Sequence, residues 1–167
     1  LMQHALAGLL DAMPESMLIF APHHNSYRRF AIESHAPLAA CWGYENRTTA
    51  LRIPMGPTQQ RRIEHRVAGA DTNPYLVLST ILAGVLAGLD QGAPPPPPTE
   101  GSAYDVNLPS LPLTWQTAYS AFAKGSVLGD LMPDVFRHML LDCKAQEMRR
   151  FAADISAFEY QSYLDQV

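Results

Sequence analysis

The sequence predicts a single α+β domain, and three observations carry that prediction. Short runs with the alternation typical of strands lie between residues 36 and 67, and helical patterns lie before and after them. The composition, 47% hydrophobic and 17% charged, is that of a soluble globular protein. The length of 167 residues leaves room for one domain.

Two elements are predicted ahead of these strands. Apolar residues at helical spacing predict a helix over Gln3–Met13, and Pro14 predicts its end. Met17–Ala21 is a short apolar run stopped by Pro22, which predicts a buried strand.

Three further strands are predicted over Ala36–Tyr44, Arg47–Ile53 and Arg61–Val67. In the last of these, a period of two places Arg62, Glu64 and Arg66 on one face. A carboxylate between two guanidiniums indicates a face for a polyanionic ligand or a metal. The alternative is an ion pair within the sheet.

Helices dominate the remainder. Tyr75–Leu89 is apolar on every side, which predicts a buried helix, with Asp71 or Asn73 as its N-cap. The five prolines Pro94–Pro98 predict an extended spacer loop, and an SH3-like partner is disfavoured because basic anchors are missing beside them. Further helices are predicted over Leu113–Ala123 and, as one or two elements, within residues 130–163.

Composition excludes several classes of function. The longest apolar stretch has 15 residues, fewer than the roughly 18 to 20 that span a bilayer, so no membrane span is expected. The two cysteines fit no disulfide or metal spacing, and no secretory signal is visible, so a cytoplasmic location is expected. The net charge of −4 argues against a nucleic-acid-binding protein.

Arginine is concentrated in one region. Seven of the twelve basic residues lie between residues 28 and 66, all are arginine, and only three acids accompany them. Because the planar guanidinium suits bidentate binding of carboxylate and phosphate, this bias predicts an anion site. Pairing of individual arginines with neighbouring acids on exposed strands is the alternative.

Four motifs, in order, resemble the glutamine synthetase family. They are Asn25-Ser-Tyr-Arg-Arg-Phe30, Asn46-Arg-Thr-Thr-Ala-Leu-Arg-Ile-Pro54, Arg62-Ile-Glu-His-Arg66 and Asn73-Pro-Tyr-Leu76. The resemblance covers essentially the whole chain, up to Phe158-Glu159-Tyr160. It implies an antiparallel sheet backed by helices, with residues 1–167 forming a C-terminal portion of the catalytic domain. The N-terminal β-domain and the upstream half of the catalytic domain would be absent.

The resemblance also implies a reaction. In this family ATP phosphorylates the side-chain carboxylate of glutamate, and ammonia or an amine then displaces phosphate from γ-glutamyl phosphate. By motif position, Arg29 and Arg66 resemble arginines that bind glutamate, and Arg47 resembles the catalytic arginine at the transferred phosphoryl group.

The remaining roles concern the nucleotide. Arg52 and Arg62, with Arg47, resemble residues near the phosphates of ATP. Glu64 resembles a glutamate that binds the Mg²⁺ or Mn²⁺ of the nucleotide.

One departure from the family lies in the flap that covers the site. Family members carry a glutamate there that binds ammonium, whereas His35 occupies the position here. Histidine is a poorer cation site than a carboxylate, so a larger amine is expected, as in the γ-glutamylpolyamine synthetases. Compensation by Glu33, or a loop histidine without a role, are the alternatives.

Two further expectations follow from the resemblance, and one hypothesis competes with it. The family resemblance implies a homo-oligomer with shared active sites. It also relates Tyr104 to a tyrosine that is adenylylated in some bacterial members. The competing hypothesis is a stand-alone anion-binding or assembly module without chemistry.

Overall fold

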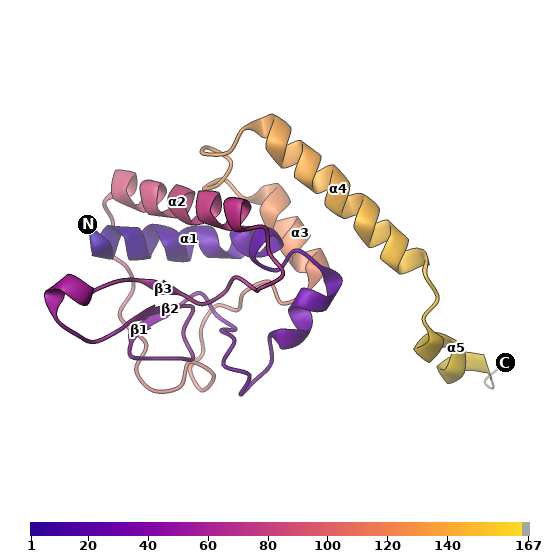
Figure 1. Cartoon of the computed structure of the whole chain (residues 1–167), viewed down its shortest axis with the longest axis horizontal. Coiled ribbons are helices and arrows are strands. Elements are labelled where there is room, and N and C mark those ends of the chain that lie inside the picture. Colours follow the sequence, from indigo (N-terminus) through magenta and orange to yellow (C-terminus); the bar gives the residue numbers. More distant parts are fainter. Residues whose placement is uncertain (165–167) are drawn as a thin grey trace. The chain divides into compact units, whose positions relative to one another are not determined.

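The computed structural model describes residues 1–164, which form two compact units divided after Pro133. The larger unit contains three α-helices, α1 (Met2–Phe20), α2 (Pro74–Gln91) and α3 (Trp115–Lys124). It also contains three strands, β1 (Trp42–Tyr44), β2 (Leu51–Ile53) and β3 (Glu64–His65), and two short 3₁₀ helices, η1 (His24–Arg29) and η2 (Thr58–Gln60). In this unit, α1 lies between α2 and the strands (Figure 1). The predicted α+β class is confirmed.

The sheet is small and mixed. Its strand order is β1-β2-β3, with β1 parallel to β2 and β2 antiparallel to β3. The implied antiparallel arrangement therefore holds for one of the two strand pairs.

Helix α1 is longer than predicted. The helix continues through Pro14 to Phe20, so both the end at Pro14 and the strand over Met17–Ala21 were wrong. An internal proline costs a helix about 3 kcal/mol. Burial outweighs that cost here, because Met13, Met17 and Phe20 are all at most 2% exposed.

The three strands are shorter than predicted because local hydrogen bonds replace regular pairing at their ends. Residues 36–41 meet the later chain irregularly, through an Ala39–Ser110 bridge and a bond from the Leu111 amide to the Leu38 carbonyl (2.8 Å). The Asn46 side chain accepts from the amide of Thr48 (3.0 Å), which turns the chain ahead of β2. Only Glu64 and His65 of the third predicted strand pair with β2.

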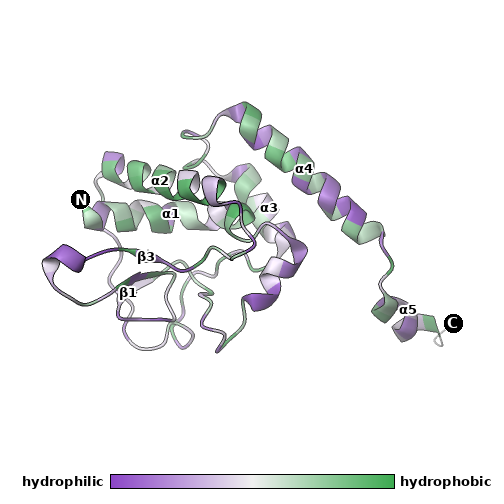
Figure 2. Cartoon of the chain, viewed as in Figure 1, coloured by the Kyte–Doolittle hydropathy of each residue, from purple (hydrophilic) through white to green (hydrophobic). Residues whose placement is uncertain are grey.

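Helix α2 confirms the predicted cap but not the predicted burial. The Asn73 side chain accepts from the amide of Tyr75 (3.0 Å), and Gly92 ends the helix in the left-handed conformation, with φ of 67°. One face contacts α1, whereas Leu78, Leu82 and Leu86 are more than half exposed. Figure 2 shows that α2 is largely hydrophobic. Apolar residues on all sides of the helix therefore did not mean burial on all sides.

By length and composition alone, α2 is the one helix within residues 1–164 that is suited to crossing a membrane, a property that core helices of soluble proteins share. It spans 18 residues, three more than the apolar stretch recognised in the sequence. The expected absence of a membrane span remains a prediction.

Helix α3 follows the prediction for Leu113–Ala123 closely. The Thr114 hydroxyl accepts from the Thr117 amide (3.2 Å), and the buried side chains of Trp115 and Phe122 lie on a helix that contacts α1. The smaller unit contains α4 (Asp134–Ala153) and α5 (Ala157–Tyr163), which confirms two helices after residue 130. Both cysteines are free.

Candidate functional site

The register of β2 against β3 builds the centre of the candidate site. Arg52 on β2 lies directly opposite Glu64 on β3, and Arg52 Nη1 donates to Glu64 Oε2 (3.1 Å). Their neighbours Leu51 and His65 also pair, and the His65 ring packs edge-on against Phe20 of α1 (centroids 4.6 Å apart). Because side chains alternate along strands, Leu51 and His65 lie toward α1 and Arg52 and Glu64 lie on the opposite face.

A second carboxylate holds Arg52 from the other side. Arg52 Nη2 donates to Glu45 Oε2 (2.5 Å), and the other oxygen of Glu45 accepts from the Met55 amide. The Met55 amide, and then the Arg52 guanidinium, lower the pKa of Glu45, and the hydrogen bond to Glu45 raises the pKa of Arg52. Glu45 is therefore ionised at neutral pH and fixes one side of the guanidinium.

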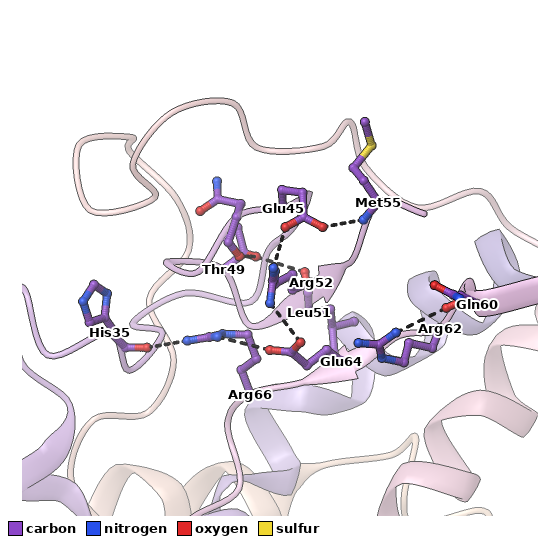
Figure 3. Close-up of polar contacts among 11 residues, drawn as sticks. His35, Glu45, Thr49, Leu51, Arg52, Met55, Gln60, Arg62, Glu64 and Arg66 are labelled. Carbon is purple, nitrogen blue, oxygen red and sulfur yellow. Dashed lines mark hydrogen bonds and ion pairs between the residues drawn. The ribbon is translucent and has the colours of Figure 1, made fainter. Parts of the chain in front are cut away.

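The network continues from Glu64 to the flap. Arg66 Nη1 donates to Glu64 Oε1 (3.3 Å), and Arg66 Nη2 donates to the backbone carbonyl of His35 (2.9 Å). Figure 3 shows the resulting chain of contacts from Met55 through Glu45, Arg52, Glu64 and Arg66 to His35. The ion pair within the sheet that the sequence left as an alternative is thus present.

His35 joins this network through its backbone. Its imidazole points away from Arg66 and is exposed (Figure 3). The carbonyl of the next residue, Ala36, accepts a hydrogen bond from the Tyr104 hydroxyl (3.0 Å). The hydroxyl proposed by resemblance as a modification site is thus engaged in a bond, and its modification remains a prediction.

Arg47 lies apart from the paired arginines. It is exposed on the turn ahead of β2, and its guanidinium makes no hydrogen bond to any residue that the structure describes. An open pocket of about 500 Å³ adjoins it, lined by Tyr44, Glu45, Asn46, Arg47, Pro98, Thr99, Glu100 and Gly101. A positively charged side chain is therefore available at the mouth of a pocket.

Two predicted residues have other surroundings. Arg29 is half-buried, stacks over Phe30 (4.2 Å to the ring centroid) and donates to the Val67 carbonyl, one residue beyond Arg66. Burial lowers the pKa of Arg29, and the Asp71 carboxylate raises it. Arg62 does not join the network, because β3 begins only at Glu64; it donates to the Gln60 carbonyl (3.3 Å).

The residues present do not form a metal site by themselves. Within residues 1–164, no three His, Cys, Asp or Glu side chains are grouped as a metal would require. Both oxygens of Glu64 already accept from arginines. The assignment of Glu64 as a ligand of Mg²⁺ or Mn²⁺ remains a prediction.

Unused donors are a further feature of the site. The Nε–H groups of Arg29, Arg52 and Arg66 are buried and find no acceptor among the described residues. Buried donors are normally satisfied, so three such groups in one arginine-rich region indicate a ligand rich in acceptor oxygens. The α+β fold thus carries an arginine-rich region of the kind suited to binding an anion.

The chain belongs to the glutamine synthetase family. The family "Glutamine synthetase, catalytic domain" matches residues 1–163. The γ-glutamylputrescine synthetase of Escherichia coli strain K12 is 40% identical over 161 residues, covering 96% of this chain and 34% of that protein. The γ-glutamylethanolamide synthetase of Streptomyces coelicolor is 41% identical over 143 residues, covering 83% of this chain and 30% of that protein.

A solved structure agrees with the family assignment. The structure of GmaS without ligand superposes with a TM-score of 0.84 at 27% identity, covering 98% of this chain and 38% of that one. The chain thus spans about a third of the length of the relatives that it matches.

Sequence reasoning missed two parts of the site. It gave no role to Glu45, although Glu45 is one of only three acids among the seven arginines. It also missed the bond from Tyr104 to Ala36, because a contact between residues 68 positions apart leaves no local pattern.

Proposed function

We propose that this chain is the C-terminal catalytic portion of an ATP-dependent ligase that joins the side-chain carboxylate of glutamate to an amine. The observation that carries the proposal is the set of three buried Nε–H donors, on Arg29, Arg52 and Arg66, that find no acceptor within residues 1–164. Glutamate and the phosphates of ATP are anions with several acceptor oxygens each. The family membership supports the same chemistry.

The proposed reaction has two steps. A carboxylate oxygen of glutamate attacks the γ-phosphorus of ATP, and ADP leaves, which gives γ-glutamyl phosphate. The amine nitrogen then attacks the acyl carbon, phosphate leaves, and the nitrogen loses a proton to give the amide. Both steps concentrate negative charge, which positioned guanidiniums stabilise.

The arginines would divide this work according to how each is held in the structure. Arg47 is the exposed guanidinium beside the pocket and would contact the transferred phosphoryl group. Arg52 is held by Glu45 and Glu64, so it would offer a fixed positive edge to the ATP phosphates, beside the exposed Arg62.

Two arginines would bind glutamate. Arg29 and Arg66 are fixed by neighbouring backbone carbonyls, at Val67 and His35 respectively. Fixed donors lose little conformational entropy when a carboxylate binds.

We further propose an organic amine, rather than ammonia, as the nucleophile. His35 replaces the flap glutamate that the family resemblance implies. The relatives at 40% and 41% identity are named as synthetases of γ-glutamylputrescine and γ-glutamylethanolamide. An imidazole is a weaker site for a small cation than a carboxylate. The flap would then select an amine by its carbon chain as well as its charge.

The whole protein would use ATP with Mg²⁺ or Mn²⁺, form a homo-oligomer and act in the cytoplasm. Glu64 would be one metal ligand, and the others would lie outside these residues, since this chain is about a third of its relatives' length. No membrane or nucleic acid is proposed as a partner.

The experiment is phosphate release by the intact gene product with ATP, Mg²⁺ and glutamate. Ammonium, putrescine, spermidine and ethanolamine are compared at equal concentration. We expect faster release with one of the larger amines. A preference for ammonium would identify an ordinary glutamine synthetase, and no release with any amine would leave the anion-binding module as the better hypothesis.

Two variants test the role of Arg47. Arg47→Gln is expected to lower phosphate release by roughly a hundredfold, in line with the loss of one charge-stabilising donor. Arg28→Gln is the matched control, because Arg28 is also exposed and makes no hydrogen bond within the described chain. Equal activity of the two variants would contradict the assignment of Arg47.

A further inference from the structure

The flap loop, residues 31–36, contains two residues with strained backbone conformations. Glu33 and His35 both adopt left-handed conformations, with φ of 67° and 59°. Each such non-glycine residue costs on the order of 1 kcal/mol. The loop is folded around Ser34, whose hydroxyl donates to the Ala31 carbonyl (2.6 Å) and accepts from the Ala36 amide (3.2 Å).

Two side chains from elsewhere in the chain hold the end of this loop. Arg66 Nη2 donates to the His35 carbonyl (2.9 Å), and the Tyr104 hydroxyl donates to the Ala36 carbonyl (3.0 Å). The two acceptors belong to consecutive residues. The position of the flap therefore depends on one donor from the ion-paired network and one from a distant loop.

Tyr104 can act as an anchor because its own loop is fixed. The Ala103 amide donates to the Thr48 hydroxyl (2.8 Å), and Asn46 Nδ2 donates to the carbonyl of Gly101 (2.7 Å). Asn46 directly precedes Arg47 in the chain. The same loop thus contacts the flap at one end and the turn that carries Arg47 at the other.

We infer that Tyr104 is a positioning residue that latches the flap loop over the amine side of the site, an inference that rests on the proposed ligase function. With the latch made, the left-handed His35 backbone is fixed. With the latch broken, the strain at Glu33 and His35 favours an open flap. An open flap admits water, which converts γ-glutamyl phosphate to glutamate and phosphate without forming an amide.

The test is Tyr104→Phe in the intact gene product, with Tyr75→Phe as the matched control. Tyr75 is 79% exposed in the first turn of α2 and far from the flap in sequence, so it loses the same hydroxyl without losing a latch. The first readout is hydrogen exchange of peptides covering residues 31–36, without substrates. Loss of one hydrogen bond is expected to speed exchange there by roughly fivefold.

The second readout is the ratio of phosphate released to γ-glutamyl amide formed, with ATP, Mg²⁺, glutamate and putrescine. We expect the ratio to rise severalfold in Tyr104→Phe and the KM for putrescine to rise, while the KM for ATP changes little. The control variant should match the wild type. A merely structural tyrosine would not change the coupling of phosphate release to amide formation.

Two results would overturn the inference. One is unchanged flap exchange and an unchanged ratio in Tyr104→Phe. The other is faster exchange throughout the protein, which would assign Tyr104 to general stability. If the wild type is inactive with every amine, the proposed function fails, but the exchange experiment still decides whether Tyr104 latches the flap.

Discussion

The helix pair α1–α2 and the polar face of the sheet are held together by opposite means. In the helix pair the backbones nearly touch, because Gly8 on α1 faces Gly84 and Gly88 on α2. On the polar face, three ion pairs join Arg52 and Arg66 to Glu45 and Glu64, and these side chains are partly exposed. We therefore expect the helix pair to contribute most to the stability of the fold and the ion pairs to determine the geometry of the site.

The strongest way to test that division is to add one methyl group between the helices. A Cβ at Gly8 would lie 2.2 Å from the Gly84 carbonyl oxygen and 2.4 Å from the Gly88 amide nitrogen. Gly8→Ala must therefore separate the helices, and we expect a loss of about 3 kcal/mol in the free energy of unfolding, measured by urea denaturation. Helix propensity alone predicts the opposite sign, a gain of about 1 kcal/mol.

Gly56→Ala is the control for this experiment. Gly56 is exposed, and a Cβ there would meet only the Gln60 side chain, at 3.5 Å or more. The free energy of unfolding should change by less than about 0.5 kcal/mol. Stabilisation by Gly8→Ala would show that the two backbones are not in contact.

The second prediction concerns His65, which lies at the boundary between the two regions. Burial lowers the pKa of His65 from 6.5 to about 4 in the folded protein. Between these two values the unfolded chain binds more protons than the folded chain, so stability must fall as the pH falls. From pH 7 to pH 5 we expect a loss of about 2 kcal/mol in the free energy of unfolding from this residue.

His65→Leu isolates this contribution. Neither ring nitrogen of His65 has a hydrogen-bond partner in the described part of the chain, so leucine removes no bond and takes away the titration. The variant should lose less stability than the wild type over the same pH range. Equal pH dependence of the two proteins would place the titrating group elsewhere.

The same two regions differ in how far the sequence predicted them. The cap and the start of α2 were predictable, because Asn73 and Pro74 are local signals that act within one turn. The exposure of the other face of α2 could not be predicted, because the same apolar pattern is compatible with a helix that packs on one side or on two. The continuation of α1 past Pro14 could not be predicted from the local residues, because it depends on burial against residues that are far away in the sequence.

On the polar face, the residue types were predictable and their partners were not. Period two placed Glu64 and Arg66 together, and they do form an ion pair. The pairing of Arg52 with Glu64 depends on the register between two strands, which no pattern within one strand records. Arg62 lies outside the network because the strand starts later than its alternation suggested.

The smallest expected effect on stability is that of Glu64→Gln, at the centre of the polar face. Glutamine keeps one acceptor oxygen, but its amide group would face a second guanidinium, so one of the bonds to Arg52 and Arg66 is lost. Because the Glu64 side chain is 33% exposed, we expect a decrease of only about 1 kcal/mol in the free energy of unfolding. Phosphate release by the intact gene product should nevertheless fall at least tenfold, because the two guanidiniums are no longer held in register.

Asp90→Asn is the control, because Asp90 is exposed near the end of α2, outside the candidate site, and its side chain makes no hydrogen bond within residues 1–164, so it should change neither property. A loss of stability in Glu64→Gln as large as that of Gly8→Ala would mean that the polar face belongs to the folding core. Unchanged phosphate release would mean that the ion pairs do not position the arginines. Either result would contradict the proposed division, in which the helix pair provides stability and the polar face of the sheet positions the arginines. That division requires Glu64→Gln to lower phosphate release more than it lowers the free energy of unfolding.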